Sequence, residues 1–290
     1  MEFFIQQFVN GLTLGSIYVL IAVGLTLVMS TMHFANFSHG QFYMLGAYLV
    51  GFFMNSYGIN FFLALVFTFV ITGLIAVGFE RISIRPIRVR GLPMIIAGVI
   101  TIGIAEVLTF GVAALWSADV RGVSSPFISG SLAIGGIYFS KPRIFITIFA
   151  FCIIALLFLL IYRTAVGRAL RAASEDREMS ALLGINADRI MCLGFFLSCG
   201  LAGICGGFMA QILPYTPFIG LSATLKGFVI IVFGGMGSMV GAVLGSYLLG
   251  VGEGLLKGYI GGSYGELFFF GILVLMLLTR PGGLLGKVEE

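Results

Sequence analysis

Long apolar runs without charge alternate with short polar segments along the whole chain. No Asp, Glu, Lys or Arg occurs between Phe3 and Phe79, which leaves room for about three membrane crossings of roughly 20 residues each. We place these crossings near residues 8–29, 36–54 and 61–79. The later apolar runs predict spans near residues 92–115, 144–162, 190–212, 225–251 and 264–279. The pattern therefore predicts an all-α integral membrane protein with about eight transmembrane helices.

The polar segment 80–91 fixes the predicted orientation. Its basic residues are Arg81, Arg85, Arg88 and Arg90. Basic loops stay on the cytoplasmic side of a membrane, and these arginines could also contact anionic lipid. Pro86 and Pro93 disfavour a continuous helix, so we expect a loop here. The polar segment 163–189 should share this side, whereas segment 116–143, which is poorer in basic residues, should be external.

The segment 163–189 is the longest polar stretch of the chain and cannot lie in hydrocarbon. Ser174 can cap a short helix by accepting from free backbone N–H groups. Glu175 and Asp176 then lie in its first turn, where the helix dipole favours negative charge. Gly184 is a natural stop, because glycine enters the left-handed conformation readily. We therefore expect a short helix on the cytoplasmic surface.

One side of this short helix is apolar. Met179, Leu182 and Leu183 recur at positions i, i+3 and i+4, which places them on one stripe. The stripe needs a partner, and two are open: the membrane domain of the same chain, or a groove on a soluble protein. Asn186 or Asp188 can cap the helix that follows.

Two apolar runs are interrupted by polar or glycine-rich segments. The first interruption contains Asn36, Ser38, His39, Gly40 and Gln41. A half-helix that starts near Ser38 or His39 would direct free N–H groups into the bundle, which is how transporters bind a carboxylate. The alternative is an ordinary loop whose polar groups only satisfy the backbone, with His39 as a structural histidine.

The second interruption contains Gly234, Gly235, Gly237 and Ser238. Irregular backbone at membrane depth survives only where it lines a cavity or packs on protein, so this segment could be a counterpart of the first. Simple counting also requires an irregular segment. Three spans before residue 80 would put the N-terminus outside, and three after residue 189 would put the basic tail 280–287 outside as well, against the charge rule. One broken segment should therefore be re-entrant or split.

Other residues within the apolar runs carry weaker signals. Glu106 is an acid at membrane depth, which makes it a functional candidate by default. The alternative is a satisfied acid that faces the bundle near the outer surface. Gly11 and Gly15 form a small-residue face that suits close helix contact.

Composition excludes several classes of protein. Only 10% of the 290 residues are charged and 59% are hydrophobic, whereas soluble domains carry about 25% charged residues. We therefore expect a single transmembrane domain over residues 1–290. The net charge of +4 is no nucleic-acid signature, because the basic residues cluster at membrane edges. No cleavable signal peptide is expected at the N-terminus. No metal site or catalytic constellation is found, and the tail sequence GGLLGK lacks Walker A spacing.

The polar segment also resembles a known family. Residues 167–172, GRALRA, together with residues 181–186, ALLGIN, look like the ATPase-coupling loop of ABC importer permeases. The patterns NFSHGQFYMLGAY, FGGMGSMVGAVLG and RPGGLLG resemble branched-chain amino acid (Liv-type) permeases, so the resemblance covers nearly the whole chain. It implies that the loop fits a cleft of an ATP-binding subunit. The residues expected to couple are Arg171, Ser174, Glu175, Asp176, Met179, Ala181, Leu182, Leu183 and Gly184. The resemblance also favours a place near the translocation path for both interruptions.

The resemblance implies a non-enzymatic permease subunit in the inner (plasma) membrane that imports branched-chain or other hydrophobic amino acids. Its expected partners are a second permease in a heterodimer, two ATP-binding subunits that hold ATP and Mg²⁺, and an extracytoplasmic solute-binding protein that docks on segment 116–143. No cofactor is expected on this chain. Two alternatives remain open: a urea or short-chain amide permease of the same superfamily, and an ion-coupled secondary transporter in which Glu106 and His39 bind ions or protons.

Overall fold

The computed structural model describes residues 2–123, 130–134, 137–280 and 282–285. The elements in order are α1 Glu2–Met32, α2 His39–Tyr57, α3 Phe61–Phe79, the π-helical turn η1 Glu80–Ile84, α4 Arg85–Val89, α5 Ile95–Trp116, β1 Ser131–Ile134, β2 Ile137–Ser140, α6 Lys141–Arg163, α7 Ala165–Glu175, α8 Arg177–Leu182, α9 Ala187–Met209, α10 Ile219–Gly234, α11 Met239–Tyr259, the 3-10 turn η3 Gly262–Tyr264 and α12 Gly265–Thr279. Helices dominate, as the sequence predicts, and the two strands form one antiparallel hairpin.

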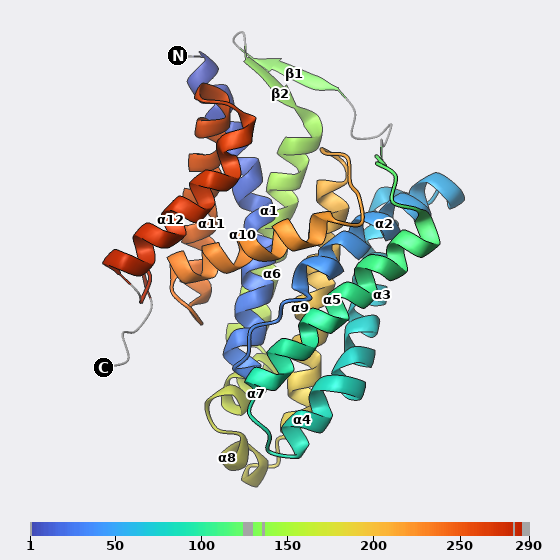
Figure 1. Cartoon of the computed structure of the whole chain (residues 1–290), viewed down its shortest axis with the longest axis vertical. Helices are drawn as coiled ribbons and strands as arrows, with labels where there is room; N and C mark the ends of the chain where they lie inside the picture. Colours follow the sequence, from blue (N-terminus) through green and yellow to red (C-terminus); the bar gives the residue numbers. More distant parts are fainter. Residues whose placement is uncertain (1, 124–129, 135–136, 281, 286–290) are drawn as a thin grey trace.

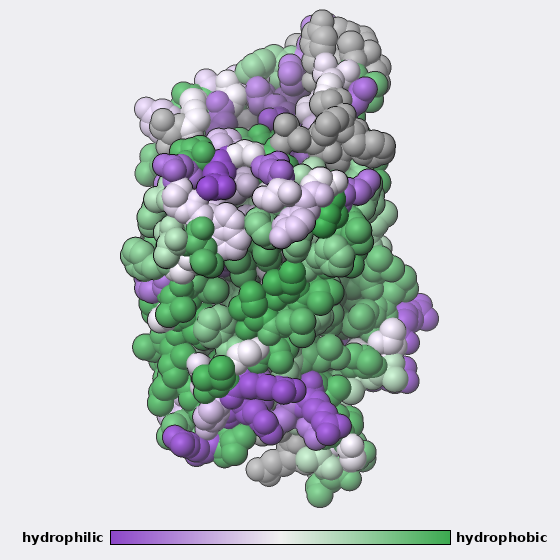
Figure 2. All heavy atoms as spheres, turned by 90° about the vertical axis from the view of Figure 1, so that its right-hand side faces the viewer, coloured by the Kyte–Doolittle hydropathy of each residue, from purple (hydrophilic) through white to green (hydrophobic). Residues whose placement is uncertain are grey.

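The number of spans differs from the expected eight. Within the described part of the chain, six helices are long and apolar enough to cross a membrane: α1, the continuous Phe61–Val89 unit, α5, α6, α9 and α11. Helices α10 and α12 are apolar but have only 16 and 15 residues, less than the roughly 20 that a crossing needs. Figure 2 shows a band of hydrophobic side chains between two more hydrophilic ends, which fits a protein embedded in a bilayer.

The helical bundle is built around α1. Residues Ile17–Val28 of α1 are buried without interruption, because α6, α9, α10 and α11 pack around this helix. Glycines allow the closest approach. A Cβ on Gly254 would lie 2.5 Å from the Cα of Gly11, and a Cβ on Gly250 would lie 2.4 Å from the Cα of Gly15. The predicted small-residue face of α1 is therefore confirmed, and its partner is α11.

The expected loop at residues 80–91 is mostly helical. Helix α3 continues through η1 into α4 and ends at Val89. Pro86 lies in the first turn of α4, directly after the π-helical turn, where a missing N–H is tolerated. The proline argument for a loop was therefore wrong, because the position of a proline within a helix decides its effect.

The predicted interruption of the apolar run 225–251 is confirmed, because the run is divided between α10 and α11 and is not one continuous span. The two helices form a hairpin around residues 235–238, in which Gly235 and Gly237 have φ values of 105° and 81°. Only glycine adopts such angles readily. Figure 1 shows α10 crossing the bundle, with α11 and α12 beside each other at one edge. The split supplies the extra change of direction that the charge rule required.

The two ends of the bundle differ in character. Helices α4, α7 and α8 lie at one end, which holds the arginine-rich segments, and the N-terminus and the β-hairpin lie at the other (Figure 1). Helix α6 begins at Lys141, so Arg143 lies in a helix and not in the predicted external loop. Residues 124–129 and 135–136 of that loop and residues 286–290 of the tail lie outside the described residues.

Candidate functional site

The first interruption is buried inside the bundle. Asn36, Ser38, His39, Gly40 and Gln41 are all buried, and α2 begins at His39, as the sequence predicts. The Asn36 amide oxygen accepts from the backbone N–H of Ser38 at 3.1 Å and from its hydroxyl at 2.7 Å. These polar groups therefore hold the extended linker against the start of α2.

The expected free N–H groups at this helix start have partners in the structure. The Gly40 N–H donates to the Thr224 hydroxyl of α10 at 3.0 Å, and the N–H groups of Gln41 and Phe42 both donate to the Ser38 carbonyl. The prediction of open donors was wrong for this conformation, because Thr224 approaches from a distant part of the sequence.

Other polar atoms at this site lack partners among the described residues. His39 Nε2 and Gln41 Oε1 are buried and make no hydrogen bond there. Glycines make the crowding possible, since a Cβ on Gly40 would lie 2.0 Å from the Gly220 carbonyl oxygen and one on Gly24 would lie 2.8 Å from the His39 ring. The site is therefore closed by packing yet retains unused hydrogen-bonding capacity.

The second interruption does not join the first. Helix α10 separates them: its start contacts Gly40, and its end leads into Gly235. Its 16 residues span about 24 Å at 1.5 Å per residue. Ser238 caps α11 by accepting from the Gly241 N–H at 3.0 Å. The tail also packs here, because the N–H groups of Leu284 and Leu285 donate to carbonyls at the end of α10.

The second interruption instead meets the polar segment 163–189. A cavity of about 230 Å³ is lined by Gly237 and Ser238 and, from α7, by Leu170, Arg171 and Ser174. The structure therefore places two sequence-predicted groups next to each other, although the sequence assigned them to different roles.

Within the polar segment, the helix caps differ from the prediction. Ser174 lies in the last turn of α7, where its hydroxyl donates to the Arg171 carbonyl, so it is no N-cap. Asp176 has that role and accepts from the Met179 N–H at 2.9 Å. The predicted stop at Gly184 and the cap at Asn186 are confirmed, with a φ of 79° and a bond from the Arg189 N–H at 3.0 Å.

The apolar stripe is exposed. Met179, Leu182 and Leu183 are 55%, 81% and 74% exposed, and Glu175, Asp176, Ala181 and Gly184 beside them are exposed as well. The first alternative, in which the stripe packs on the membrane domain of the same chain, is therefore wrong. Helix α7, in contrast, is anchored by buried Gly167, Leu170 and Ala173.

Two further predictions about charged residues need correction. Arg88 is nearly buried and pairs with Glu80 at 2.7 Å and with Asp188 of α9 at 3.1 Å, so it ties the α3–α4 unit to α9 and does not face lipid. Glu106 is exposed at the middle of α5, so it does not face the bundle of this chain.

Sequence reasoning missed a buried ionic cluster. The fully buried Glu253 of α11 binds both Lys226 and Lys257 at 2.8 Å, and the Tyr18 hydroxyl donates to its second carboxylate oxygen. Only the i,i+4 pair of Glu253 and Lys257 is visible in the sequence. Lys226, 27 residues away, carries no local signal.

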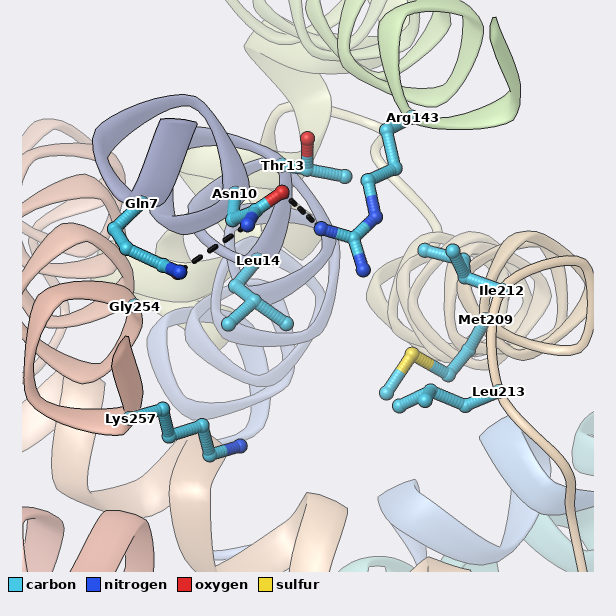
Figure 3. Close-up of a pocket in the computed structure, with 10 residues that line it drawn as sticks. All are labelled: Gln7, Asn10, Thr13, Leu14, Arg143, Met209, Ile212, Leu213, Gly254 and Lys257. Carbon is cyan, nitrogen blue, oxygen red and sulfur yellow. Dashed lines mark hydrogen bonds between the residues drawn. The ribbon is translucent and has the colours of Figure 1, made fainter. Parts of the chain in front are cut away.

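This ionic cluster borders a cavity of about 210 Å³ toward the end of the bundle that holds the N-terminus. Figure 3 shows Arg143 of α6 bonded to Asn10 of α1, with Lys257 of α11 across the cavity. Two cations thus line one cavity, and Leu14 and Met209 supply part of its apolar wall.

The chain is similar to known transport proteins over nearly its whole length. A family model described as the permease component of a branched-chain amino acid transport system matches residues 7–277. The chain is 35% identical to the branched-chain amino acid permease protein BraD of Pseudomonas aeruginosa and 34% identical to LivH of Escherichia coli, in both cases over 99% of this chain and 97% of the relative. It is 28% identical to LivM of E. coli over 94% of this chain and 68% of the relative. No solved structure matches.

Proposed function

This chain belongs to the family of branched-chain amino acid transport permease components, and from that membership we propose that it imports branched-chain or other hydrophobic amino acids at the expense of ATP. It is a multi-pass membrane permease with six helices, among the described residues, that are able to span a bilayer. In the proposal, ATP and Mg²⁺ bind to two separate subunits, and this chain resides in the inner membrane.

The observation that carries the proposal is the exposed stripe on α8. Met179, Leu182 and Leu183 are mostly exposed, although burial of each such side chain stabilises a contact by about 1.5–3 kcal/mol. The preceding helix α7 is anchored in the bundle. A protruding apolar helix on a fixed base is suited to dock into the groove of an ATPase subunit and to pass its movement on.

The movement has a short route into the bundle. One cavity lies between α7 and the α10–α11 turn. It is lined by Arg171 and Ser174 on one side and by Gly237 and Ser238 on the other. Glycines at the turn allow large changes of φ and ψ, which is a common property of hinges. In the proposal, displacement of α7 repositions α10, whose other end packs on Gly40, and so opens or closes the interior of the bundle.

The similarity to both LivH and LivM supports a pair of related permeases, so we place a second permease subunit beside this one. A solute-binding protein would deliver the substrate at the end that holds the β-hairpin. In the proposal, the buried Asn36–Gln41 segment lies next to the translocation path, and its unused polar atoms become available when α2 and α10 separate.

The test replaces Leu182 by Asp in the assembled importer. Placing a charge on the docking face should lower leucine-stimulated ATP hydrolysis at least tenfold, because about 1.4 kcal/mol of lost contact already changes an equilibrium tenfold. The control is Ile82→Asp, an apolar residue of similar exposure (77% exposed) that lies in η1, outside both the α8 stripe and the β-hairpin end. Equal hydrolysis in both variants would refute docking through α8. Uptake driven by an ion gradient without ATPase subunits would instead indicate a secondary transporter, and uptake of urea in place of leucine would indicate an amide permease.

A further inference from the structure

A second cavity borders the ionic cluster on its other side. It measures about 250 Å³ and lies between α10 and α12, which meet near one edge of the bundle (Figure 1). Its charged residues are Lys226 and Glu266, and the rest of its lining includes the aromatic residues Phe218, Phe269 and Phe270. The cavity therefore combines one cation and one anion with apolar walls.

The lysine in this cavity is held in place and retains a free donor. Lys226 Nζ donates to Glu253 at 2.8 Å and to the Tyr18 hydroxyl at 3.0 Å, and it lies 5.1 Å from the centre of the Phe269 ring. An ammonium group has three N–H donors, so one has no acceptor among the residues that the structure describes. Because the carboxylate of Glu253 is shared with Lys257, two positive charges face one negative charge and the cluster retains a net charge of +1.

The acid in the same cavity is not neutralised by that lysine. Glu266 is exposed in the first turn of α12, and it makes no ion pair with any residue that the structure describes, Lys226 included. Opposite charges that face one cavity without touching each other leave room for a ligand that carries both charges. The surplus positive charge beside Lys226 and the exposed carboxylate of Glu266 offer one charged partner to each end of such a ligand, and hydrogen bonds between charged groups are stronger than neutral ones.

We propose that this α10–α12 cavity binds a zwitterionic α-amino acid with an apolar side chain. Its carboxylate accepts from the remaining N–H of Lys226, its ammonium donates to Glu266, and its side chain packs on the exposed ring of Phe270. This inference rests on the proposed function and refines it, since a neutral amide would satisfy neither charge. A lipid with a phosphate and an amine in its headgroup has a similar charge pattern, and the experiment separates it from the amino acid.

The experiment measures equilibrium binding of tritiated leucine to the whole importer in nanodiscs, without solute-binding protein. Glu266→Gln should weaken leucine binding about tenfold, as expected for the loss of one charge-assisted hydrogen bond. The same substitution should leave the affinity for 4-methylpentanoate unchanged, because this compound lacks the ammonium group. Lys226→Gln should weaken the binding of leucine. It should leave the binding of leucinamide unchanged, because leucinamide lacks the carboxylate. Glu2→Gln, an exposed acid in the first turn of α1, is the matched control.

The outcomes are distinguishable. Leucine binding that is unchanged by Glu266→Gln, an exposed position that should not disturb folding, would overturn the cavity assignment. The assignment also fails if the wild-type importer binds no leucine in this assay while ATP-driven leucine uptake with the solute-binding protein is normal, and the proposed function then stands. If Glu266→Gln alters only the retention of phosphatidylethanolamine, a lipid occupies the cavity and the amino-acid assignment is wrong. Absence of leucine uptake by the complete wild-type system would refute the proposed function itself.

Discussion

Gly40 offers the sharpest test of how α2 and α10 are joined. In Gly40→Ala, the new Cβ would lie 2.0 Å from the Gly220 carbonyl oxygen and 2.3 Å from the Thr224 hydroxyl. Because the nearest atom belongs to the backbone of α10, no side chain can rotate away, and the two helices must separate.

The expected loss has two parts. Overpacking of a close contact costs about 1–3 kcal/mol, and separation also breaks the hydrogen bond from the Gly40 N–H to Thr224, worth about 1 kcal/mol. We therefore expect a loss of about 2–4 kcal/mol, which lowers the melting temperature of the solubilised protein by roughly 10 °C. Leucine uptake in proteoliposomes should fall as well, because α10 no longer rests on the start of α2.

The matched control is Gly103→Ala on α5. A Cβ there meets no atom within 4 Å, so the substitution should be neutral or should stabilise the helix by up to about 1 kcal/mol. The assay is thermal unfolding of both variants in the same detergent. Equal melting temperatures for the two variants would refute the reasoning, since they would show that α2 and α10 tolerate an extra methyl group at their contact.

Three more predictions concern buried charges and the hinge. Glu253→Gln leaves two ammonium groups without a full counter-charge and should lower the free energy of unfolding by about 3–5 kcal/mol. Lys257→Met leaves one ion pair intact and should lower it less. A lower melting temperature for Lys257→Met than for Glu253→Gln would contradict this. Arg88→Met leaves the buried Glu80 without its ion-pair partner and should lower the free energy of unfolding by a similar ~3–5 kcal/mol. An unchanged melting curve would contradict this. Gly234→Ala would place a Cβ 2.2 Å from a backbone oxygen of α11 and should reduce uptake while α8 remains accessible to a thiol probe at Leu182→Cys; normal uptake would remove the turn from the proposed route of coupling.

Much of the architecture follows from local sequence. Uninterrupted apolar runs near 61–79, 144–162 and 190–212 predict helices α3, α6 and α9 to within a few residues, because a membrane core admits few other structures. The stop at Gly184 and the cap at Asn186 are equally local, since each depends on one residue and its immediate neighbours.

Some errors arise where neighbouring residues compete for the same structural role. The sequence places Pro86 in a loop and Ser174 at a helix start, but the π-helical turn before Pro86 and the competing cap at Asp176 reverse both assignments. The glycines at residues 234–237 predict an interruption of the run 225–251, but hydropathy alone does not show that the chain turns back there.

The candidate sites also combine features that local sequence predicts with contacts that depend on distant residues. Local sequence is sufficient to predict a multi-helix membrane protein with one polar segment and an apolar stripe, because hydropathy and helical period are local properties. The packing of the helices places Thr224 at the start of α2 and Lys226 against Glu253, and it leaves the apolar stripe on α8 exposed. Contacts between residues far apart in the chain depend on how whole helices pack, and packing leaves no periodic trace in the sequence.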